Sequence, residues 1–444
     1  MKSEIKTYTY PDQAIERVQI VHFDRFEDLH FYHPDDDPGS FEAIATLYRD
    51  YIVRIYAIIL GTVIIYHVPD GFLDEELSYG DDYGTIYEKQ MQVNALFRKN
   101  IGLRKGRLYF RNDQTKRLFE RLQAEGLLMI AKGKRKFLSL VPVGNDSGYL
   151  SKEKEFRLKV NGSFFVFDLP DLKSPYDVVG SPFGLCIKDG QVLRPPLIDR
   201  ETLIVYRDGK VQIRKMSLND VTVIIDGKEY RHGKNACFFS RPEYSRSPAG
   251  GHDLVIINDR VVAEKNGGNT PIPSGGFILK LSDVTVGQDH SVSYGRMDEI
   301  VFAIQGGNSA IIDGVPVKGF ISSFYNIFHF WKTSFPPSLY PLHYQKDRAP
   351  RIVLGADKEG KPMLLWFEGA GKFGYQKGKE SAGASLKEAA EICKDLGMVN
   401  GIHLDGGGSA QILLNNERSL KIADRDPITY NEIERAVPSG LYVK

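Results

Sequence analysis

Apolar and polar residues alternate in short runs over much of the chain, and a period of two is typical of half-buried β-strands. Ile402 and Leu404 alternate in this way directly before three consecutive glycines. From residue 155 onward, Asp-Gly pairs separate many β-rich runs, for example at Asp189, Asp208, Asp226 and Asp313. Asp-Gly between two apolar runs is a strong hairpin signal. We therefore expect a β-rich domain in this part of the chain.

Two segments instead repeat their apolar residues with the period of an α-helix. Residues 113–124 place their apolar side chains on one face, and so do residues 385–396. The second helix begins with Ser385-Leu-Lys-Glu388, a capping box, and ends at Gly397, which suits the C-terminal stop. We expect an α+β fold of β-rich mixed sheets with a few helices packed on them.

The charge of the chain is balanced overall but unevenly distributed. A hydrophobic content of 42% is typical of a folded protein, and the formal net charge of +1 gives no whole-chain argument for nucleic acid. Residues 1–97 hold 18 acidic and 7 basic side chains, whereas residues 98–136 hold 13 basic and 3 acidic ones. A solvated helix face and a charged hairpin explain the basic stretch better than a nucleic-acid-binding wing.

The cysteines and the N-terminus favour a reducing compartment. Three cysteines far apart in sequence do not make a disulfide framework, and the first residues lack the apolar segment of a signal peptide. The most membrane-like run, residues 51–68, is interrupted by Arg54 and Gly61, so two strands joined at Gly61 are favoured over a membrane span. We expect a cytoplasmic protein without a membrane partner, and its oligomeric state stays open.

The segment from Asn400 to Leu414 is the strongest candidate for a functional site. Three glycines between two apolar runs indicate a turn with positive φ or the close approach of a ligand. Asp405 would lie at the end of the preceding strand, beside the exposed N–H groups of the glycines. A glycine-rich hairpin with Asp405 as a turn residue explains this segment about equally well.

Several segments carry motifs in a fixed order along residues 155–444. They are Val160-Asn-Gly-Ser-Phe-Phe165, Asn269 to Leu279, Gln305 to Gly314, Arg348-Ala-Pro-Arg351, Leu364 to Gly369, the helix from Ser385, Leu404-Asp-Gly-Gly-Gly-Ser409, and Glu434 to Gly440. In this order they resemble the phosphodiester glycosidase family. The resemblance divides the chain into an N-terminal region, 1–150, of strands and one basic helix, and a catalytic domain, 151–444.

Four residues depart from the pattern of that family. Ile352 replaces threonine, Glu368 replaces aspartate, Ala370 replaces arginine, and His403 lies where asparagine is common. The missing arginine and threonine would be consistent with a different substrate or a weakened site.

The resemblance implies cleavage of the C1–O bond of a sugar 1-phosphodiester, in which a phosphomonoester leaves easily because it is a weak base. Such a reaction needs a carboxylate that attacks C1 or activates water, and donors that hold the phosphate. We expect Asp405 to be the catalytic carboxylate and Glu368 the second one, with a surface turn residue as the alternative for Glu368. Arg351 would clamp the phosphate, or form a buried ion pair with either carboxylate.

Further residues would bind the substrate. Ser409 and the N–H groups of Gly406, Gly407 and Gly408 would donate to the phosphate or the sugar. On the sugar side would lie Asn161 and the backbone of Gly306 and Gly307, with Arg348 and His403 nearby. Three of these have structural alternatives: Asn161 would cap a turn, Arg348 would be a solvated loop charge, and His403 would be a satisfied core residue.

The function that we expect is hydrolysis of a small-molecule or glycan phosphodiester, such as a precursor of a cell-surface exopolysaccharide or a nucleotide-linked sugar. Three alternatives stay open: a non-catalytic binder of a phosphorylated sugar or nucleotide, a phosphodiesterase that breaks the P–O bond, and, least favoured, nucleic-acid binding through residues 98–136. No cofactor is predicted with certainty. A divalent cation such as Ca²⁺ or Mg²⁺ beside Asp405 stays open, although no ligand cluster with metal spacing is visible.

Overall fold

The computed structural model contains mostly β-strands and few helices. It describes residues 1–32, 156–166, 181–241, 243–282, 290–317, 348–370, 377–424, 431–435 and 437–444, with shorter segments between residues 51 and 176. Its two longest helices in these ranges are α3 (Asp113–Ala124) and α6 (Leu386–Asp395). None of the described helices is both long and apolar enough to span a bilayer.

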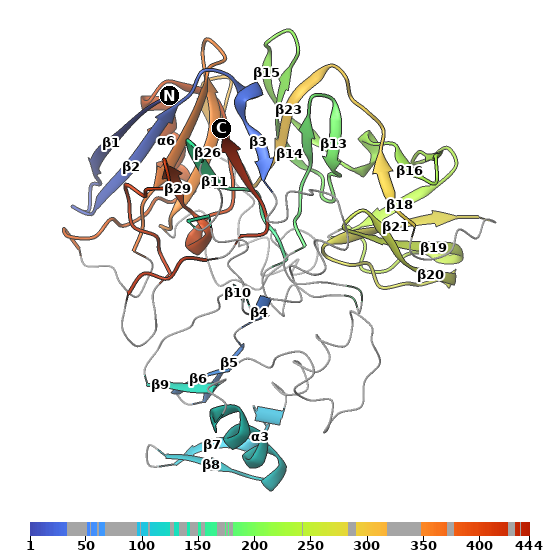
Figure 1. The fold of residues 1–444 in the computed structure, drawn as a ribbon, viewed down its shortest axis with the longest axis vertical. Coiled ribbons are helices and arrows are strands. Elements are labelled where there is room, and N and C mark those ends of the chain that lie inside the picture. The colour runs from blue at the N-terminus through green and yellow to red at the C-terminus, as the bar shows by residue number, and fades with distance from the viewer. Residues whose placement is uncertain are drawn as a thin grey trace.

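The largest sheet joins the N-terminal strands to the late part of the chain (Figure 1). Its strands, in spatial order, are β1 (Lys2–Thr9), β2 (Ile15–His22), β27 (Pro362–Phe367), β26 (Arg351–Asp357), β28 (Met398–His403), β24 (Ser309–Ile312) and β25 (Val315–Pro316). Val18 of β2 lies opposite Phe367 of β27. The first strands therefore belong to the same sheet as the strands that lead to the glycine segment.

Both faces of this sheet are covered by apolar side chains. On one face, Ile392 and Cys393 of α6 pack in one cluster with Val353 and Leu365. On the other face, Ile352 packs in a second cluster, together with side chains of the neighbouring sheets. Because successive residues of a strand point to opposite faces, this division fixes which side chains of β26 and β28 can meet.

Four further sheets complete the main body. One has the order β29 (Ile412–Leu414), β11 (Leu158–Asn161), β30 (Gly440–Val443) and β3 (His30–Tyr32). A second has the order β13 (Gln191–Arg194), β12 (Cys186–Lys188), β23 (Ile300–Gln305), β14 (Arg200–Tyr206) and β15 (Val211–Met216). The other two have the orders β18 (Cys237–Ser240), β21 (Gly276–Leu281), β19 (Ala249–Ile257), β20 (Arg260–Gly268), and β17 (Lys228–Tyr230), β16 (Val223–Ile225), β22 (Val292–Tyr294).

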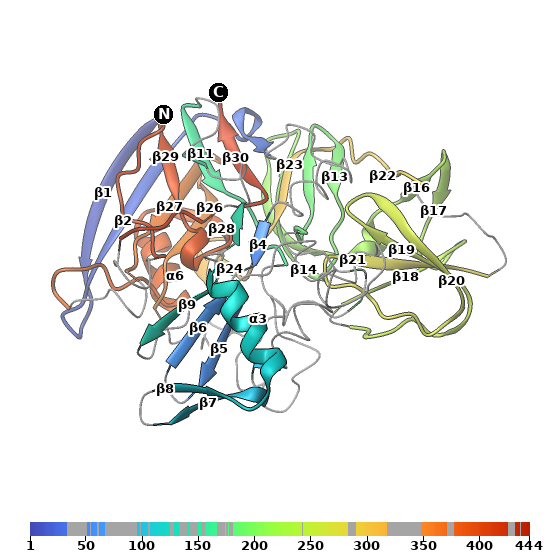
Figure 2. The same ribbon diagram turned by 60° about the horizontal axis from the view of Figure 1, so that its bottom comes forward.

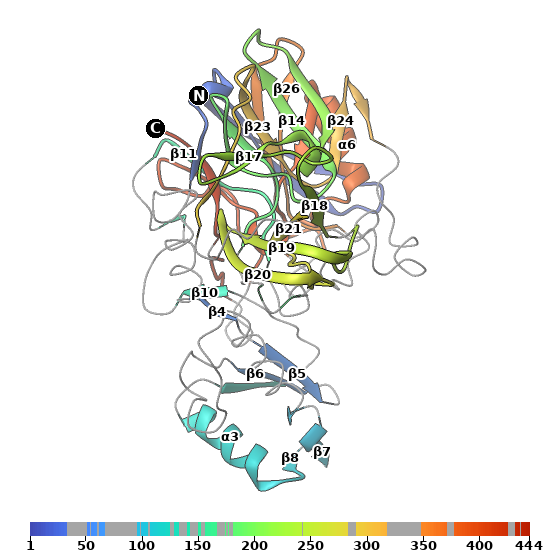
Figure 3. The same cartoon turned by 90° about the vertical axis from the view of Figure 1, so that its right-hand side faces the viewer.

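The remaining described elements lie together at one end of the molecule, below the main body in Figures 1 and 3. They are α3 and the strands β4 (Tyr51–Val53), β5 (Ile55–Ile59), β6 (Thr62–Tyr66), β7 (Ile101–Arg104), β8 (Arg107–Phe110), β9 (Leu128–Lys132) and β10 (Leu140–Pro142). Figure 2 shows α3 beside the β5–β6–β9 sheet. The basic turn after β9 lies outside the described residues.

The sequence predicted both helices correctly, and β5 and β6 pair as expected on either side of residues 60–61, which lie outside the described residues. Helix α6 has the expected capping box, in which the Ser385 hydroxyl accepts from the Glu388 N–H at 3.2 Å and the Glu388 carboxylate accepts from the Ser385 N–H at 2.9 Å. Gly397 ends the helix with φ of 83°. The α+β class is roughly consistent with a structure that is mostly β-strand, but the sheets are not mixed, because every ladder between the described strands is antiparallel.

Position 352, one of the departures from the family pattern, lies in the core. Ile352 is fully buried between Trp366 and Leu404 in the cluster opposite α6. Its side chain therefore fills apolar space and does not face the helix-covered side of the sheet.

This burial gives a stability prediction. We expect Ile352→Thr to lower the free energy of unfolding by about 1–3 kcal/mol more than Ile352→Val does. Valine and threonine match in shape, but threonine buries a hydroxyl group. Urea unfolding of both variants measures the difference. Equal stabilities would show that a polar group is accommodated at this position.

Candidate functional site

The glycine segment follows β28 at a point where two sheets meet. The N–H of Asp405 donates to the carbonyl of Gly162 at 3.1 Å, which ties the end of β28 to the residue after β11. The Asn161 amide donates to the Asp405 carbonyl at 2.8 Å and accepts from the Gln411 N–H at 3.1 Å. Asn161 is fully engaged in holding both ends of the glycine segment. This is a structural role like the one that we considered for it, because both ends of its amide group bond to backbone.

Close packing explains why this segment is rich in glycine. Gly407 has φ of 61°, which disfavours most side chains. A Cβ atom at Gly406 would meet the carbonyl oxygen of Pro350 at 2.7 Å, and one at Gly408 would overlap the carboxylate of Asp424. The glycines therefore allow backbone and a carboxylate of the protein itself to approach.

Two of the three glycine N–H groups are not available as anion donors in this arrangement. Gly406 donates to Oδ1 of Asp405 at 2.9 Å, and Gly407 donates to the Pro350 carbonyl at 3.0 Å. Ser409 is fully buried, and its hydroxyl bonds to Asp405. We expected these groups to face a ligand, whereas the Gly406 N–H and the Ser409 hydroxyl hold the carboxyl group of Asp405 and the Gly407 N–H bonds to backbone.

Asp405 is a half-buried carboxyl group in a defined polar setting. Burial raises its pKa to about 6, while the Ser409 hydroxyl, the positive charge of Arg435 and the Gly406 N–H act in the opposite direction. The negative charge of Asp424 adds to the upward shift. A carboxyl group with a pKa near the working pH is suited to general acid or base chemistry.

Arg435 and Asp424 complete the site, and sequence reasoning missed both as functional residues. Arg435 pairs with Asp424 through two hydrogen bonds of 2.9 and 3.1 Å, and its Nη1 lies 3.4 Å from the Ser409 hydroxyl oxygen. Arg435 lies within the closing motif, Glu434 to Gly440, which could have drawn attention to it. Asp424 follows an unremarkable turn and carries no sequence signal.

The structure places Arg351 beside His403 and α6. Its Nε donates to the carbonyl of Ala384 at 3.0 Å. His403 is buried, and its two ring nitrogens have no hydrogen-bond partner within the described ranges. Burial and the charge of Arg351 lower the pKa of His403 to about 3, so the ring is neutral at physiological pH. His403 pairs with Val353 across the β26–β28 ladder, and both side chains lie on the helix-covered face of the sheet.

Gly306 and Gly307 lie against the end of β28. Gly307 donates to the His403 carbonyl at 2.7 Å, and a Cβ atom at Gly306 would overlap the same carbonyl. Arg348 bonds to Glu388 at 2.7 Å and to Asp12 at 2.8 Å, so it is paired and is not the solvated loop charge that we considered. These contacts give Arg348 a structural role at the start of α6.

Glu368 is not brought together with Asp405. Its Oε1 accepts from the Lys421 N–H at 2.9 Å, and its Oε2 lies 3.3 Å from Nε of Arg17. It follows Phe367, which packs on the helix-covered face, so its side chain points to the opposite face. Glu368 is also buried, which excludes the surface turn residue that we considered as its alternative.

Within the described residues, no group of three or more histidine, cysteine, aspartate or glutamate side chains is arranged to hold a metal ion. Asp405 and Asp424 are the acidic side chains that the structure brings to the glycine segment. Two carboxylates alone make an incomplete cation site.

Two solved structures are similar to this chain in part. A hypothetical protein from Synechocystis is 16% identical, with a TM-score of 0.40; the match covers 99% of this chain and 61% of that one, so this chain spans less than two thirds of its length. The zebrafish N-acetylglucosamine-1-phosphodiester alpha-N-acetylglucosaminidase catalytic domain, auto-inhibited by its pro-peptide, is 13% identical, with a TM-score of 0.36; the match covers 100% of this chain and 82% of that one.

Sequence comparison gives one match that covers half of the chain. A family model described as phosphodiester glycosidase matches residues 219–444, a range that includes Asp405, Ser409, Asp424 and Arg435. Among curated proteins, none matches this sequence.

The raised pKa of Asp405 predicts a pH-dependent stability difference. The native state holds the proton of Asp405 up to about pH 6, whereas an unfolded aspartate releases it near 3.8. The native state therefore loses stability as the pH rises from about 3.8 to about 6, because ionisation is less favourable in the native state than in the unfolded state. Below this range Asp405 is protonated in both states, and the effect is absent. We therefore compare the free energy of unfolding of Asp405→Asn with that of the wild type at each pH. The difference should shift by about 1–3 kcal/mol in favour of Asp405→Asn when the pH rises from 4 to 7.

Urea unfolding at several pH values measures this gain, and Glu359→Gln in an exposed turn controls for the loss of one negative charge. A difference between wild type and Asp405→Asn that stays constant with pH would contradict the raised pKa.

Proposed function

Because this chain belongs to the phosphodiester glycosidase family, we propose that it hydrolyses the C1–O bond of a sugar 1-phosphodiester and releases the sugar and a phosphomonoester. The observation that supports this proposal most directly is the carboxyl group of Asp405. It lies on the glycine segment with a pKa of about 6, held by the Gly406 N–H and the Ser409 hydroxyl.

In the proposed reaction, ionised Asp405 accepts a proton from a water molecule while the water oxygen attacks C1. The C1–O bond breaks, its electron pair stays with the phosphate oxygen, and the sugar keeps the new hydroxyl group. A phosphate monoester is a weak base, so it leaves with little need of a general acid. One carboxylate is therefore enough for the proton transfer. The proposed reaction does not need Glu368, whose side chain points to the other face of the sheet.

Arg435 is the cation that we propose to stabilise the charge that develops on the phosphate. Its guanidinium group lies beside Ser409 and influences the pKa of Asp405. An arginine donates through a planar fork that matches phosphate oxygens. The bonds to Asp424 orient that fork, which makes Asp424 a positioning residue in this proposal.

The substrate class follows from the same chemistry. A nucleotide-linked sugar or a precursor of a cell-surface polymer offers a sugar C1 joined to phosphate, and its leaving group carries the charge that Arg435 would meet. We propose that a small-molecule or glycan phosphodiester of this kind is the substrate.

We expect Asp405→Asn to reduce kcat on the methyl ester of a hexose 1-phosphate by roughly 10²–10⁴-fold, the usual contribution of a general base. Steady-state release of the reducing sugar measures this loss, and near-UV circular dichroism checks that the variant is folded. Glu368→Gln is the matched control, since it removes a carboxylate from the other face of the sheet and should change kcat only a few-fold. The reverse result, with full activity in Asp405→Asn, would assign the reaction to another residue.

Labelled water distinguishes C–O cleavage from P–O cleavage. In H₂¹⁸O we expect the label in the C1 hydroxyl group of the released sugar, because water attacks carbon. Mass spectrometry of both products locates it. Label in the phosphate would assign the enzyme to the phosphodiesterases, and recovery of every ester of a panel intact would favour a non-catalytic binder.

A further inference from the structure

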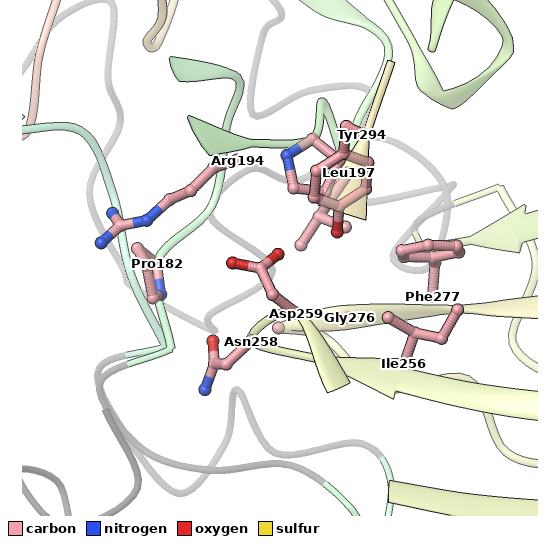
Figure 4. A pocket seen from close by; sticks show the side chains of 11 residues that line it. Pro182, Arg194, Leu197, Ile256, Asn258, Asp259, Gly276, Phe277 and Tyr294 are labelled. Carbon is pink, nitrogen blue, oxygen red and sulfur yellow. The ribbon is translucent and has the colours of Figure 1, made fainter. Parts of the chain in front are cut away.

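A second polar cavity lies away from the glycine segment, where β13, β22 and the turn between β19 and β20 meet (Figure 4). Its charged and polar lining residues are Arg194, Asp259, Tyr294 and Asn258, beside apolar side chains such as Phe277. The enclosed space is about 20 Å³, which suits one small group, and about 330 Å³ is empty when the open mouth is included.

Arg194 lines this cavity, and its guanidinium group extends past Pro182 on the side away from Asp259 (Figure 4). It is 8% exposed, and the part of the chain that the structure describes offers it no hydrogen bond or ion pair. Arginine carries five N–H donors and stays charged, so a buried arginine normally finds acceptors. Its guanidinium group is therefore open to an acceptor from outside the described residues.

Asp259 faces the same cavity from the opposite side. Asn258 and Asp259 form the turn of the β19–β20 hairpin with φ of 45° and 63°, and the Val292 N–H fixes the turn by donating to the Asp259 carbonyl at 2.7 Å. The carboxyl group accepts a hydrogen bond from the Tyr294 hydroxyl. One carboxylate offers about four acceptor sites, so room for another donor remains.

Arg194 and Asp259 influence each other without forming an ion pair. Burial raises the pKa of Asp259 to about 7, while the Tyr294 hydroxyl and the charge of Arg194 act in the opposite direction. A gap between a donor and an acceptor of opposite charge suits a ligand that carries both an anionic oxygen and an O–H group.

We propose that this cavity binds inorganic phosphate, with Arg194 donating to the phosphate oxygens and Asp259 accepting the proton that phosphate retains. This ligand goes beyond the proposed hydrolysis, because none of the cavity residues belongs to the Asp405 site. The requirement for an O–H group sets the specificity. At pH 8 inorganic phosphate keeps one P–OH group, whereas sulfate has none and a phosphate monoester, with its second pKa near 6, has lost it.

Isothermal titration calorimetry of the full chain at pH 8 and constant ionic strength tests this proposal. Sodium phosphate should bind at one site per chain, and Arg194→Gln should remove that site. Sodium sulfate and methyl phosphate should bind at least about tenfold more weakly, since neither gives the Asp259 carboxylate the additional donor that phosphate supplies. Asp259→Asn should abolish this preference, because asparagine tolerates positive φ and its amide offers both a donor and an acceptor.

Arg214→Gln, on the exposed side of β15, is the matched control and should leave binding unchanged. A folded wild type that binds no phosphate, a folded Arg194→Gln that keeps the site, or equal affinity for sulfate and phosphate would each overturn the proposal. Asp405→Asn should bind phosphate as the wild type does, so a failure of this proposal and a failure of the proposed hydrolysis are distinguishable.

Discussion

The hydrogen bond from the Asp405 N–H to the Gly162 carbonyl is the contact on which the site depends, because it joins two sheets at the end of β28. It acts together with the bond from the Gly407 N–H to the Pro350 carbonyl, which holds the glycines against the residue before β26. Asn161 reinforces the junction by bonding to backbone on both sides of the glycines. Motifs that are far apart in sequence thus converge on one turn of backbone, and the close packing of that turn requires glycine.

This junction also determines the electrostatics of the site. Asp405 lies near a second carboxylate, Asp424, and is nevertheless half-buried, an arrangement that disfavours its ionised form. Arg435 offsets part of that cost and is itself held by Asp424. The raised pKa has two consequences: the native state loses stability when Asp405 ionises, and the carboxyl group can exchange protons near neutral pH. Groups whose ionised form is destabilised in this way are common in functional sites.

Much of the fold could be predicted from sequence because its signals are local. The capping box at Ser385, the Asp-Gly hairpins and the alternation before Asp405 each depend on residues a few positions apart. The sheet partners are not local: β2 pairs with β27 more than 300 residues away in sequence, and no pattern in β2 identifies that partner. Arg435 and Asp424 were missed for the same reason, since their importance comes from packing against Gly408 and Ser409.

Glu368 illustrates how a one-residue change of phase alters a functional interpretation. Its position at the end of an apolar strand suggested a side chain that emerges beside Asp405, yet successive residues of β27 alternate between the two faces of the sheet. Phe367 points to the α6 side, and Glu368 therefore points to the other, where Arg17 and Lys421 hold it. The same alternation buries Ile352 in the core on that side. The isoleucine that replaces the family's threonine is thus an element of packing, and it gives no reason to regard the Asp405 site as weakened.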